Sequence, residues 1–586
     1  MFRSLLLACF VLAASLAQAA PPPFDDSALA PPGYAATCAL PNLAVYNVVT
    51  GYGAKGDGVA DDTRAIRAAL AAAVANKGGV IYLPTGTYLV CPQPGDPIPK
   101  PAAATVTTPF GDIFHLTSSN LTFIGDGPAK TIIKGRCFGL TDPLTNWVVT
   151  GDPNNYIKIG RFTVFGIFST TGTGPISNIA FRSLTIDGGA GFTGNFAVGG
   201  DPTTGDGWDM RHNGIRVSGP VALDNILMLN CDLKNFRGEV VWAGGQFVQR
   251  LFVLGSKVHG SNASAVSCSA DIVVNSTQIG GPVAGDDVYN GVENYANVAG
   301  AVGVGQQTVI ENNCLIQASS GKPRGNGGGY IGPKEASLTV TDSTFTGNAS
   351  AILFSEQAYN VTVAGNKFTN NSNVSISSIL NLYPQMAYRG FGNMVFESNT
   401  LTSSGCLLIS QAGNIQNLLL VGNSIGTGSQ LLSGSFAPAT GAPPSIFVVA
   451  RNSFAAGSKD VTSGFSGPRA FWRGNTRPMI SAGAVPTTAF NKYDAFALVP
   501  AFTIMPATDL VYLNSNKALA GTFQPITIDP VVLAAIPDGF QFTILCANPR
   551  WSLKADPTQN TLTADYPLAP TGTRITVSGS KVYVNK

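Results

Sequence analysis

The stretch Tyr52–Ile66 reads YGAKGDGVADDTRAI and places three glycines, one lysine and three aspartates at the start of a helical pattern. Such a loop is a candidate for binding phosphate, for binding calcium, or for shaping a turn in a scaffold. It lacks the G-x-x-x-x-G-K-[ST] spacing of a phosphate-binding loop. It also lacks the glutamate that closes an EF-hand calcium loop. We therefore interpret the stretch as structural and expect its aspartates to shape turns and cap a helix.

The residues around and after this stretch predict a capping helix and a first pair of strands. Asp61 or Asp62 provides the N-cap side chain. An apolar stripe follows at every fourth position, formed by Ile66, Leu70 and Val74. Gly78 and Gly79 end the helix, and the segment 80–90 reads as two short strands. A helix with one apolar face suits the end of a β structure, because an open strand edge invites aggregation.

From about residue 176 one unit recurs, in which an apolar strand is followed by Asn or Ser, a small turn and another short strand. The steps between units vary from 21 to 37 residues, as expected for coils with a fixed core and variable loops. A β-sandwich would not repeat the same unit, so the pattern predicts an all-β fold, a parallel β-helix. The apolar positions that define the repeat are Ile226, Leu251, Ile272, Val309, Leu338, Val361, Met394, Leu418 and Ile446.

Asparagine recurs just after the strand of many units. In a β-helix these side chains are expected to stack at one turn, where each amide bonds its neighbour and the residue tolerates a left-handed backbone. The alternative is that Asn marks ordinary turns. The positions are Asn230, Asn313, Asn366, Asn399, Asn423 and Asn452.

The N-terminus predicts export, because Arg3 is followed by an apolar run and by the small residues Ala17, Ala19 and Ala20. We expect a signal peptide over 1–19, the β-helix with its cap over 20–484 and a small antiparallel β module over 485–586. No later window holds about 18 uninterrupted apolar residues, so membrane insertion is not expected.

Composition narrows the class of partner. Charged residues make up 12% of the chain and the net charge is +2, which does not favour nucleic acid. Eight cysteines remain once Cys9 leaves with the signal peptide, an even number that permits disulfides in an exported protein. Cys38 and Cys91 flank the opening segment and are candidates for a clamp. Cys231, Cys268 and Cys314 are expected to be buried. Three histidines and no C-x-x-C pair argue against a zinc site, so no metal is predicted.

The motif YGAKGDGVADDTRAIRAALAAA, followed by GGVIYLPTGTYLV, closely resembles the N-terminal motif of the pectate lyase superfamily. The resemblance covers about 40 residues directly, and the repeats extend it to roughly residue 480. It implies a right-handed parallel β-helix and a secreted, extracellular or periplasmic, carbohydrate-active protein with a polysaccharide partner. It does not fix the reaction, because such scaffolds host hydrolases, lyases, epimerases and binders. The sequence leaves the oligomeric state open.

Ionisable residues concentrate between Asp206 and Glu293, where we expect the site. Glu239 and Asp286 lie at similar places two coils apart, or about 9.6 Å at a strand spacing of about 4.8 Å. That separation is close to the upper limit of about 9.5 Å for inverting glycosidases. The catalytic candidates are Asp209, His212, Glu239, His259, Asp286 and Asp287. The substrate-binding candidates are Arg211, Arg237, Trp242 and Tyr289.

Two comparisons with chemistry leave the reaction open. His259-Gly260 is similar to the His-Gly of polygalacturonases and Asp286-Asp287 to their Asp-Asp pair, but the order is reversed and the following Arg-x-Lys is not evident. A lyase needs a base and neutralisation of a uronate by Arg or calcium. We expect a polysaccharide-cleaving enzyme, with glycoside hydrolysis slightly favoured and no cofactor except calcium for a lyase. The alternatives are a lyase or epimerase on a uronate polymer, or a non-catalytic glycan-binding β-helix.

Overall fold

A computed structural model of the chain describes most of the coil-forming strands. The residues described are 26–91, 93, 112–135, 163–189, 212–236, 238–244, 247–261, 263–283, 286, 288, 290–294, 308–317, 330–331, 336–348, 350–354, 358–369, 373–376, 391–402, 407–409, 415–432, 446–461, 470–473, 489–494, 501–502, 508–514, 524–528, 541–546, 551–553, 566–567, 573–578 and 581–585. The predicted signal peptide lies outside them. Among the described residues, no helix is long and apolar enough to cross a membrane.

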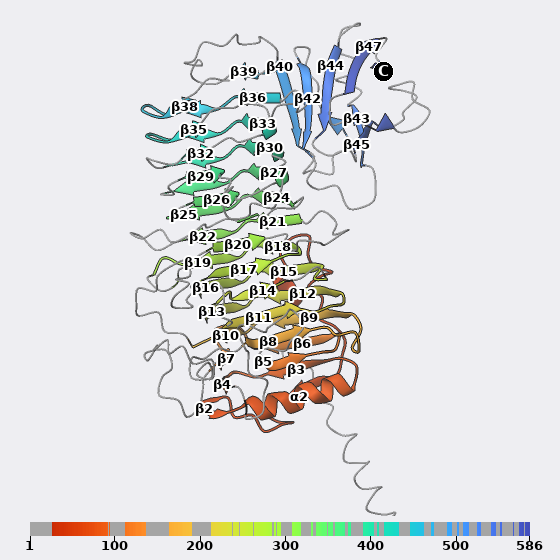
Figure 1. Ribbon diagram of the computed structural model, residues 1–586, viewed down its shortest axis with the longest axis vertical. Helices are drawn as coiled ribbons and strands as arrows, with labels where there is room; N and C mark the ends of the chain where they lie inside the picture. Colours follow the sequence, from red (N-terminus) through yellow and green to blue (C-terminus); the bar gives the residue numbers. More distant parts are fainter. Residues whose placement is uncertain are drawn as a thin grey trace, which may run out of the picture. The chain divides into compact units, whose positions relative to one another are not determined.

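The chain divides into two compact units, residues 1–335 with 342–355 and 368–375, and residues 336–341 with 356–367 and 376–586. In the first unit each coil adds a strand to each of three parallel sheets (Figure 1). Sheet one contains β1 (Val45–Asn47), β3 (Gly79–Leu83), β6 (Leu121–Gly125), β9 (Ile176–Arg182), β12 (Leu223–Leu229), β15 (Arg250–Leu254), β18 (Asp271–Asn275) and β21 (Thr308–Asn312).

Sheets two and three complete the coils of this unit. Sheet two contains β2 (Asp57–Asp61), β4 (Gly86–Val90), β7 (Thr131–Gly135), β10 (Thr185–Asp187), β13 (Asp232–Phe236), β16 (Lys257–Ser261), β19 (Gln278–Gly280), β22 (Leu315–Gln317), β25 (Thr344–Thr346) and most of β28 (Lys367–Thr369). Sheet three contains β5 (Asp112–Leu116), β8 (Thr163–Phe168), β11 (Asn213–Ser218), β14 (Val241–Ala243), β17 (Ser264–Cys268), β20 (Asn290–Asn294), β23 (Tyr330–Ile331), β26 (Ser350–Phe354) and most of β29 (Asn373–Ile376). The predicted parallel β-helix is confirmed.

The second unit continues the same architecture in its own strands. One parallel sheet contains β24 (Ala336–Thr341), β27 (Ala358–Ala364), β30 (Phe391–Glu397), β33 (Ile415–Val421), β36 (Ile446–Ala450) and β39 (Ala470–Arg473). The other two contain β31 (Thr400–Leu401), β34 (Ser424–Ile425) and β37 (Ser453–Phe454), and β32 (Leu407–Ile409), β35 (Gln430–Leu432) and β38 (Lys459–Val461).

The C-terminal module is mixed, so the prediction of an antiparallel module was wrong in part. Its larger sheet runs β40 (Ala489–Asp494), β42 (Thr508–Asn514), β44 (Gln541–Cys546), β47 (Thr573–Ser578) and β48 (Lys581–Asn585). The smaller sheet runs β41 (Ala501–Phe502), β43 (Gln524–Ile528), β45 (Trp551–Leu553) and β46 (Tyr566–Pro567). The first three strands of the larger sheet pair in parallel and the last two add antiparallel. Parallel pairing needs a long crossover, which 495–507 and 515–540 supply, whereas β47 and β48 are joined by two residues.

The core of each coil is built from the apolar repeat positions. Ile226, Leu251 and Ile272 are register partners on β12, β15 and β18, and all three side chains are fully buried. Alternate residues therefore point inward, and the outward residues of sheets two and three are left to carry polar chemistry.

The capping helix is α2 (Thr63–Ala75), which packs against β1 and β3. Ile66 and Leu70 are buried as predicted, but Val74 is only half-buried and Ala73 takes its place in the buried face. A spacing of eight residues drifts by about 80° around a helix, whereas a spacing of seven stays on one side. The predicted stripe was therefore correct over two turns and slipped in the third.

The aspartates of the opening stretch shape turns, as predicted. Asp62 is the N-cap residue of α2, but its carboxylate accepts from the backbone N–H of Lys55 at 2.5 Å and of Gly56 at 3.0 Å. Asp61 instead accepts from the N–H of Thr63 at 2.9 Å, at the start of the helix. Asp57 accepts from the two N–H groups of its own turn. The stretch is a hydrogen-bonded scaffold.

The turn between the first two sheets holds the asparagine row. In the second unit Asn366, Asn399, Asn423 and Asn452 are buried, and each Nδ2 donates to the next Oδ1 at 2.9 to 3.0 Å. The left-handed residue is the one before, for example Ser398 with φ 53°.

Asn230 and Asn313, in the first unit, behave differently from that row. They occupy the left-handed position itself, with φ 51° and 53°. Cys231 and Cys314 fill the following inner position, where their backbone N–H groups donate to Ser256 and Ser343. The predicted single row therefore joined two neighbouring positions of the turn.

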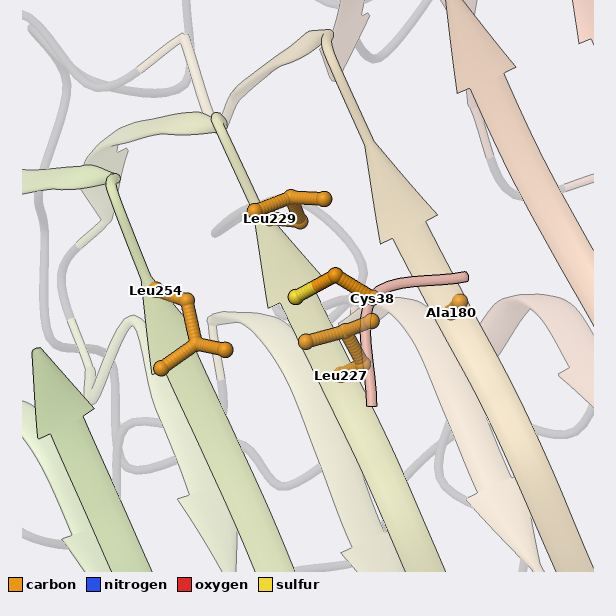
Figure 2. Packing of buried hydrophobic residues seen from close by; sticks show 5 residues of the cluster. All are labelled: Cys38, Ala180, Leu227, Leu229 and Leu254. Atoms are coloured by element: carbon orange, nitrogen blue, oxygen red, sulfur yellow. The ribbon is translucent and has the colours of Figure 1, made fainter. Parts of the chain in front are cut away.

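The segment 26–44 crosses the outside of sheet one and removes the predicted clamp. Cys38 packs against Ala180, Leu227, Leu229 and Leu254, as Figure 2 shows. Cys91 lies instead on sheet two, with its sulfur 3.6 Å from Asp61 Oδ2, and the two cysteines form no disulfide. Cys231, Cys268 and Cys314 are buried, as expected. The segment is also held at its start, where the buried Arg182 donates to Asp26 at 2.8 Å.

Candidate functional site

Several predicted site residues lie outside the described residues. These are Asp209, Arg211, Arg237, Asp287 and Tyr289, and their roles stay predictions. The described candidates are His212, Glu239, Trp242, His259 and Asp286, and the structure separates them onto two different sheets.

His259 and Asp286 come together on the outward face of sheet two. His259 Nδ1 lies 2.8 Å from Asp286 Oδ1, and its Nε2 lies 2.8 Å from Asp232 Oδ1. Two lysines complete the group: Lys234 is 2.6 Å from Asp232, and Lys257 is 3.7 Å from Asp286. We call these five residues the sheet-two cluster. Its charges are matched in pairs.

The pKa of Asp232 reflects this pairing. Burial raises the pKa, but hydrogen bonds from His259 and Lys234 outweigh burial together and leave the pKa below its ordinary value. Since both ring nitrogens of His259 are engaged, the geometry of the cluster is that of a brace, and a catalytic role for His259 and Asp286 stays a prediction.

His212 and Glu239 occupy equivalent places at the starts of β11 and β14, as the sequence suggested. The register pairs Ile215 with Val241 and Arg216 with Trp242. His212 is 2% exposed, and its ring centroid lies 5.3 Å from that of Phe236. Glu239 is also buried and accepts from Asn213 Nδ2 at 3.0 Å.

Arg216 and Trp242 stand on the outward face of sheet three. The Arg216 guanidinium lies 5.1 Å from the centroid of the Trp242 ring, in cation–π contact. Arg216 is buried and Trp242 is half-buried. The sequence prediction named Trp242 but not Arg216, whose place beside the aromatic ring depends on the register of two strands.

Asp112 and His115 extend this row and were also missed. The register aligns His115 with Gly166 and Gly166 with Arg216. A Cβ at Gly166 would collide with the Asp112 carboxyl group, so the glycine is what lets this group lie over the middle strand. We call Asp112, His115, Arg216 and Trp242 the sheet-three row.

The row is electrostatically unbalanced. Burial raises the pKa of Asp112 to about 7 although Arg216 lowers it, and Asp112 Oδ1 has no hydrogen-bond partner. Burial and the nearby Arg216 lower the pKa of His115, whose Nε2 has no partner either. At pH 6 Asp112 and His115 are therefore both largely neutral beside a permanent cation.

Glu293, on β20, is a further acid near this face. Its carboxylate accepts from Ser264 Oγ, and Ser264 in turn accepts from Asn290 Nδ2 at 3.3 Å. Burial raises the pKa of Glu293, and the hydrogen bonds from Ser264, Asn290 and Ser267 only partly oppose this. Asn213 and Ser264, which hold Glu239 and Glu293, lie on strands two steps apart, about 9.6 Å at about 4.8 Å per step.

A calcium site does not emerge from the described part of the chain. No group of three or more His, Cys, Asp or Glu residues there has the arrangement to hold a metal ion. Asp286, one of the carboxylates considered for calcium, is engaged by His259. The described residues therefore do not fit a bound calcium ion.

Comparisons with known proteins agree with this fold. Residues 45–218 match the family described as Rhamnogalacturonase A/epimerase, pectate lyase-like. A mannuronan C5-epimerase of Azotobacter vinelandii, AlgE5, is 42% identical over 89 residues, which is 15% of this chain and 7% of that protein. Alginate lyase 7 of the same organism is 40% identical over 89 residues, or 15% of this chain and 9% of that protein. The chain thus matches under a tenth of each relative's length.

A solved structure is also similar. The A-module of the Azotobacter vinelandii mannuronan C-5 epimerase AlgE6 is 18% identical, with a TM-score of 0.39. The match covers 72% of this chain and all of that module.

Proposed function

We propose that this chain, which belongs to the pectate lyase superfamily of parallel β-helix proteins, is a carbohydrate-active enzyme that acts on an acidic polysaccharide at the sheet-three row. The reaction that the row supports best is removal of the proton next to a uronate carboxylate, as in a lyase or an epimerase. The observation that carries the proposal is a guanidinium flanked by a neutral imidazole and an indole.

Arg216 is the group that binds the uronate carboxylate in this proposal. Removal of the adjacent proton places negative charge on that carboxylate, so a cation held against it stabilises the transition state more than the ground state. Its contact with Trp242 fixes the guanidinium on the outward face. The indole ring also offers a surface for packing a sugar ring.

His115 is the proposed base. Its lowered pKa keeps the imidazole neutral, and hence able to accept a proton, to more acidic pH than a free histidine. Its ring is held edge-on to Phe168, with centroids 6.0 Å apart. In a lyase the sugar–oxygen bond on the neighbouring carbon breaks as the proton leaves. In an epimerase a proton returns from the opposite face.

Asp112 tunes this arrangement without contacting substrate. While its carboxyl group is neutral, the charge of Arg216 is available to an anionic ligand. Above about pH 7 the carboxylate forms and competes for that charge. We therefore assign Asp112 as a positioning residue.

Glycoside hydrolysis is the second candidate, and one observation favours it. Glu239 and Glu293 are held by groups about 9.6 Å apart, near the upper limit for the two carboxyl groups of an inverting glycosidase. The raised pKa of Glu293 suits a general acid. Both side chains are buried and engaged in hydrogen bonds, which is why we rank this reaction second.

The experiment follows the hydrogen on the carbon that bears the carboxylate, using purified protein with uronate polymers and matched neutral polymers. Proton abstraction predicts unsaturated ends, seen as ultraviolet absorbance, or deuterium at that carbon in heavy water. New reducing ends with that hydrogen retained would instead establish hydrolysis. Binding without any chemical change would establish a glycan-binding protein. We also propose that the protein is secreted, on the strength of its predicted signal peptide.

A further inference from the structure

His259 joins three successive coils of the first unit. It lies on β16, Asp232 lies on β13 one coil before, and Asp286 follows β19 one coil after. Each carboxylate is 27 residues away in sequence and 2.8 Å away in space. The imidazole ring is 7% exposed and each carboxylate is about a fifth exposed, so the contacts are partly shielded from water.

The two contacts set a requirement on protons. An ionised carboxylate only accepts hydrogen bonds, and neutral imidazole carries a single N–H. Only the imidazolium form donates to both Asp232 and Asp286. Loss of one proton leaves a ring lone pair facing a carboxylate oxygen, which replaces an attraction by a repulsion.

The charged groups around the ring support the doubly protonated form. Asp232 faces it from β13, and its lowered pKa keeps it ionised at mildly acidic pH. Lys234 and Lys257 pair with the outer oxygens of the two carboxylates, and Asp187 on β10 is engaged by Asn235 at 2.9 Å. With two carboxylates and two lysines, the imidazolium brings the net charge of the group to +1.

Asp286 connects the cluster to sheet three. Its backbone carbonyl accepts from Gly260 N–H at 3.1 Å, so both its main chain and its side chain are tied to β16. Asn290 begins β20 four residues later. The strand also carries Glu293. Whatever loosens Asp286 loosens the entry to a strand of sheet three.

We propose that His259 is a proton-dependent latch, which ties Asp232 and Asp286 together in its imidazolium form and releases the entry to β20 when it loses a proton. The latch is closed between the acidic pH at which the carboxylates gain protons and the higher pH at which His259 gives one up. This device does not depend on the proposed reaction.

The test follows protons and backbone opening in the full chain. The protein has three histidines, so nitrogen NMR of labelled imidazoles can resolve His259 by comparison with a His259→Gln variant. In parallel, hydrogen exchange of β16 and β20 is measured over a pH series and corrected for intrinsic rates, with 121–135 as the reference segment. Exchange in β20 is expected to rise roughly tenfold or more as His259 deprotonates, the effect of losing one charge-assisted hydrogen bond.

His259→Gln is expected to exchange rapidly in β20 at every pH, with the reference segment unchanged. If this variant does not fold, the wild-type titration alone decides. A neutral His259 at a pH where both carboxylates are ionised would overturn the proposal. Exchange in β20 that ignores the protonation of His259 would overturn it as well.

Discussion

The outward faces of sheets two and three both carry buried charge, but they balance it differently. In the sheet-two cluster each charged group has an opposite partner, four of the contacts lying within 3.7 Å. In the sheet-three row, Asp112 and His115 each keep a buried polar atom without a partner beside Arg216. The first arrangement stabilises a fold, and the second stores polar groups for something else. Charge density alone therefore does not identify a site.

The largest expected effect is that of His115→Gln, which removes the proposed base. Activity should fall by about 10² to 10⁴, the usual contribution of a positioned acid or base. The wild-type rate should stay high down to pH values below about 6.5, because the pKa of His115 is lowered from that of a free histidine. Steady-state kinetics over a pH series checks both. An acidic limb centred above 6.5, or one that survives in the variant, would rule His115 out.

Arg216→Ala should lower kcat/KM on a uronate polymer by about 10² to 10³, as when a group that stabilises developing charge is removed. Arg250→Ala is the matched control, since Arg250 forms an exposed pair with Asp224 on sheet one. Equal losses in the two variants would show that the sheet-three row is not special.

Asp112→Asn tests the imbalance as a stability effect. A raised folded-state pKa means that the folded protein binds more protons than the unfolded chain between about pH 4 and 7, so stability falls as pH rises through that window. The variant should be more stable than wild type at pH 8, on the order of 2–4 kcal/mol, and nearly equal to it at pH 4. Denaturant midpoints at the two pH values measure the difference. A gain independent of pH would contradict the assignment.

The smallest expected effect lies in the sheet-two cluster. Lys257 is about a third exposed and 3.7 Å from Asp286, so Lys257→Ala should change stability by only about 0.5 kcal/mol. The same denaturation assay applies, in low and high salt. A loss above about 2 kcal/mol would mean that this lysine belongs to the buried network, and the contrast between the two faces would weaken.

The fold was largely predictable because periodicity and turn chemistry are local. Ile226, Leu251 and Ile272 announce the stack by spacing alone, and the glycines and aspartates near Asp62 announce the cap. What failed was a matter of one position or one partner. Val74 slipped out of the helix face, and Asn230 belongs to a different place in the turn from Asn366.

The site was less predictable because it depends on register between distant coils. Phe114, Phe165 and Ile215 are register partners although they are 51 and 50 residues apart in sequence. Variable loops hide such alignment, so His115 and Arg216 could not be placed together from the sequence. A usable signal was present in Gly166, a glycine within the apolar strand TVFGIF, which marks a close approach of another group.

The most direct test of the sheet-three row is the fate of the hydrogen beside the uronate carboxylate, measured for wild type and Arg216→Ala in heavy water. We predict that wild type removes this hydrogen, leaving unsaturated ends or deuterium on that carbon, and that the variant does so at least about a hundredfold more slowly. Cleavage of the polymer with the hydrogen fully retained would contradict the account.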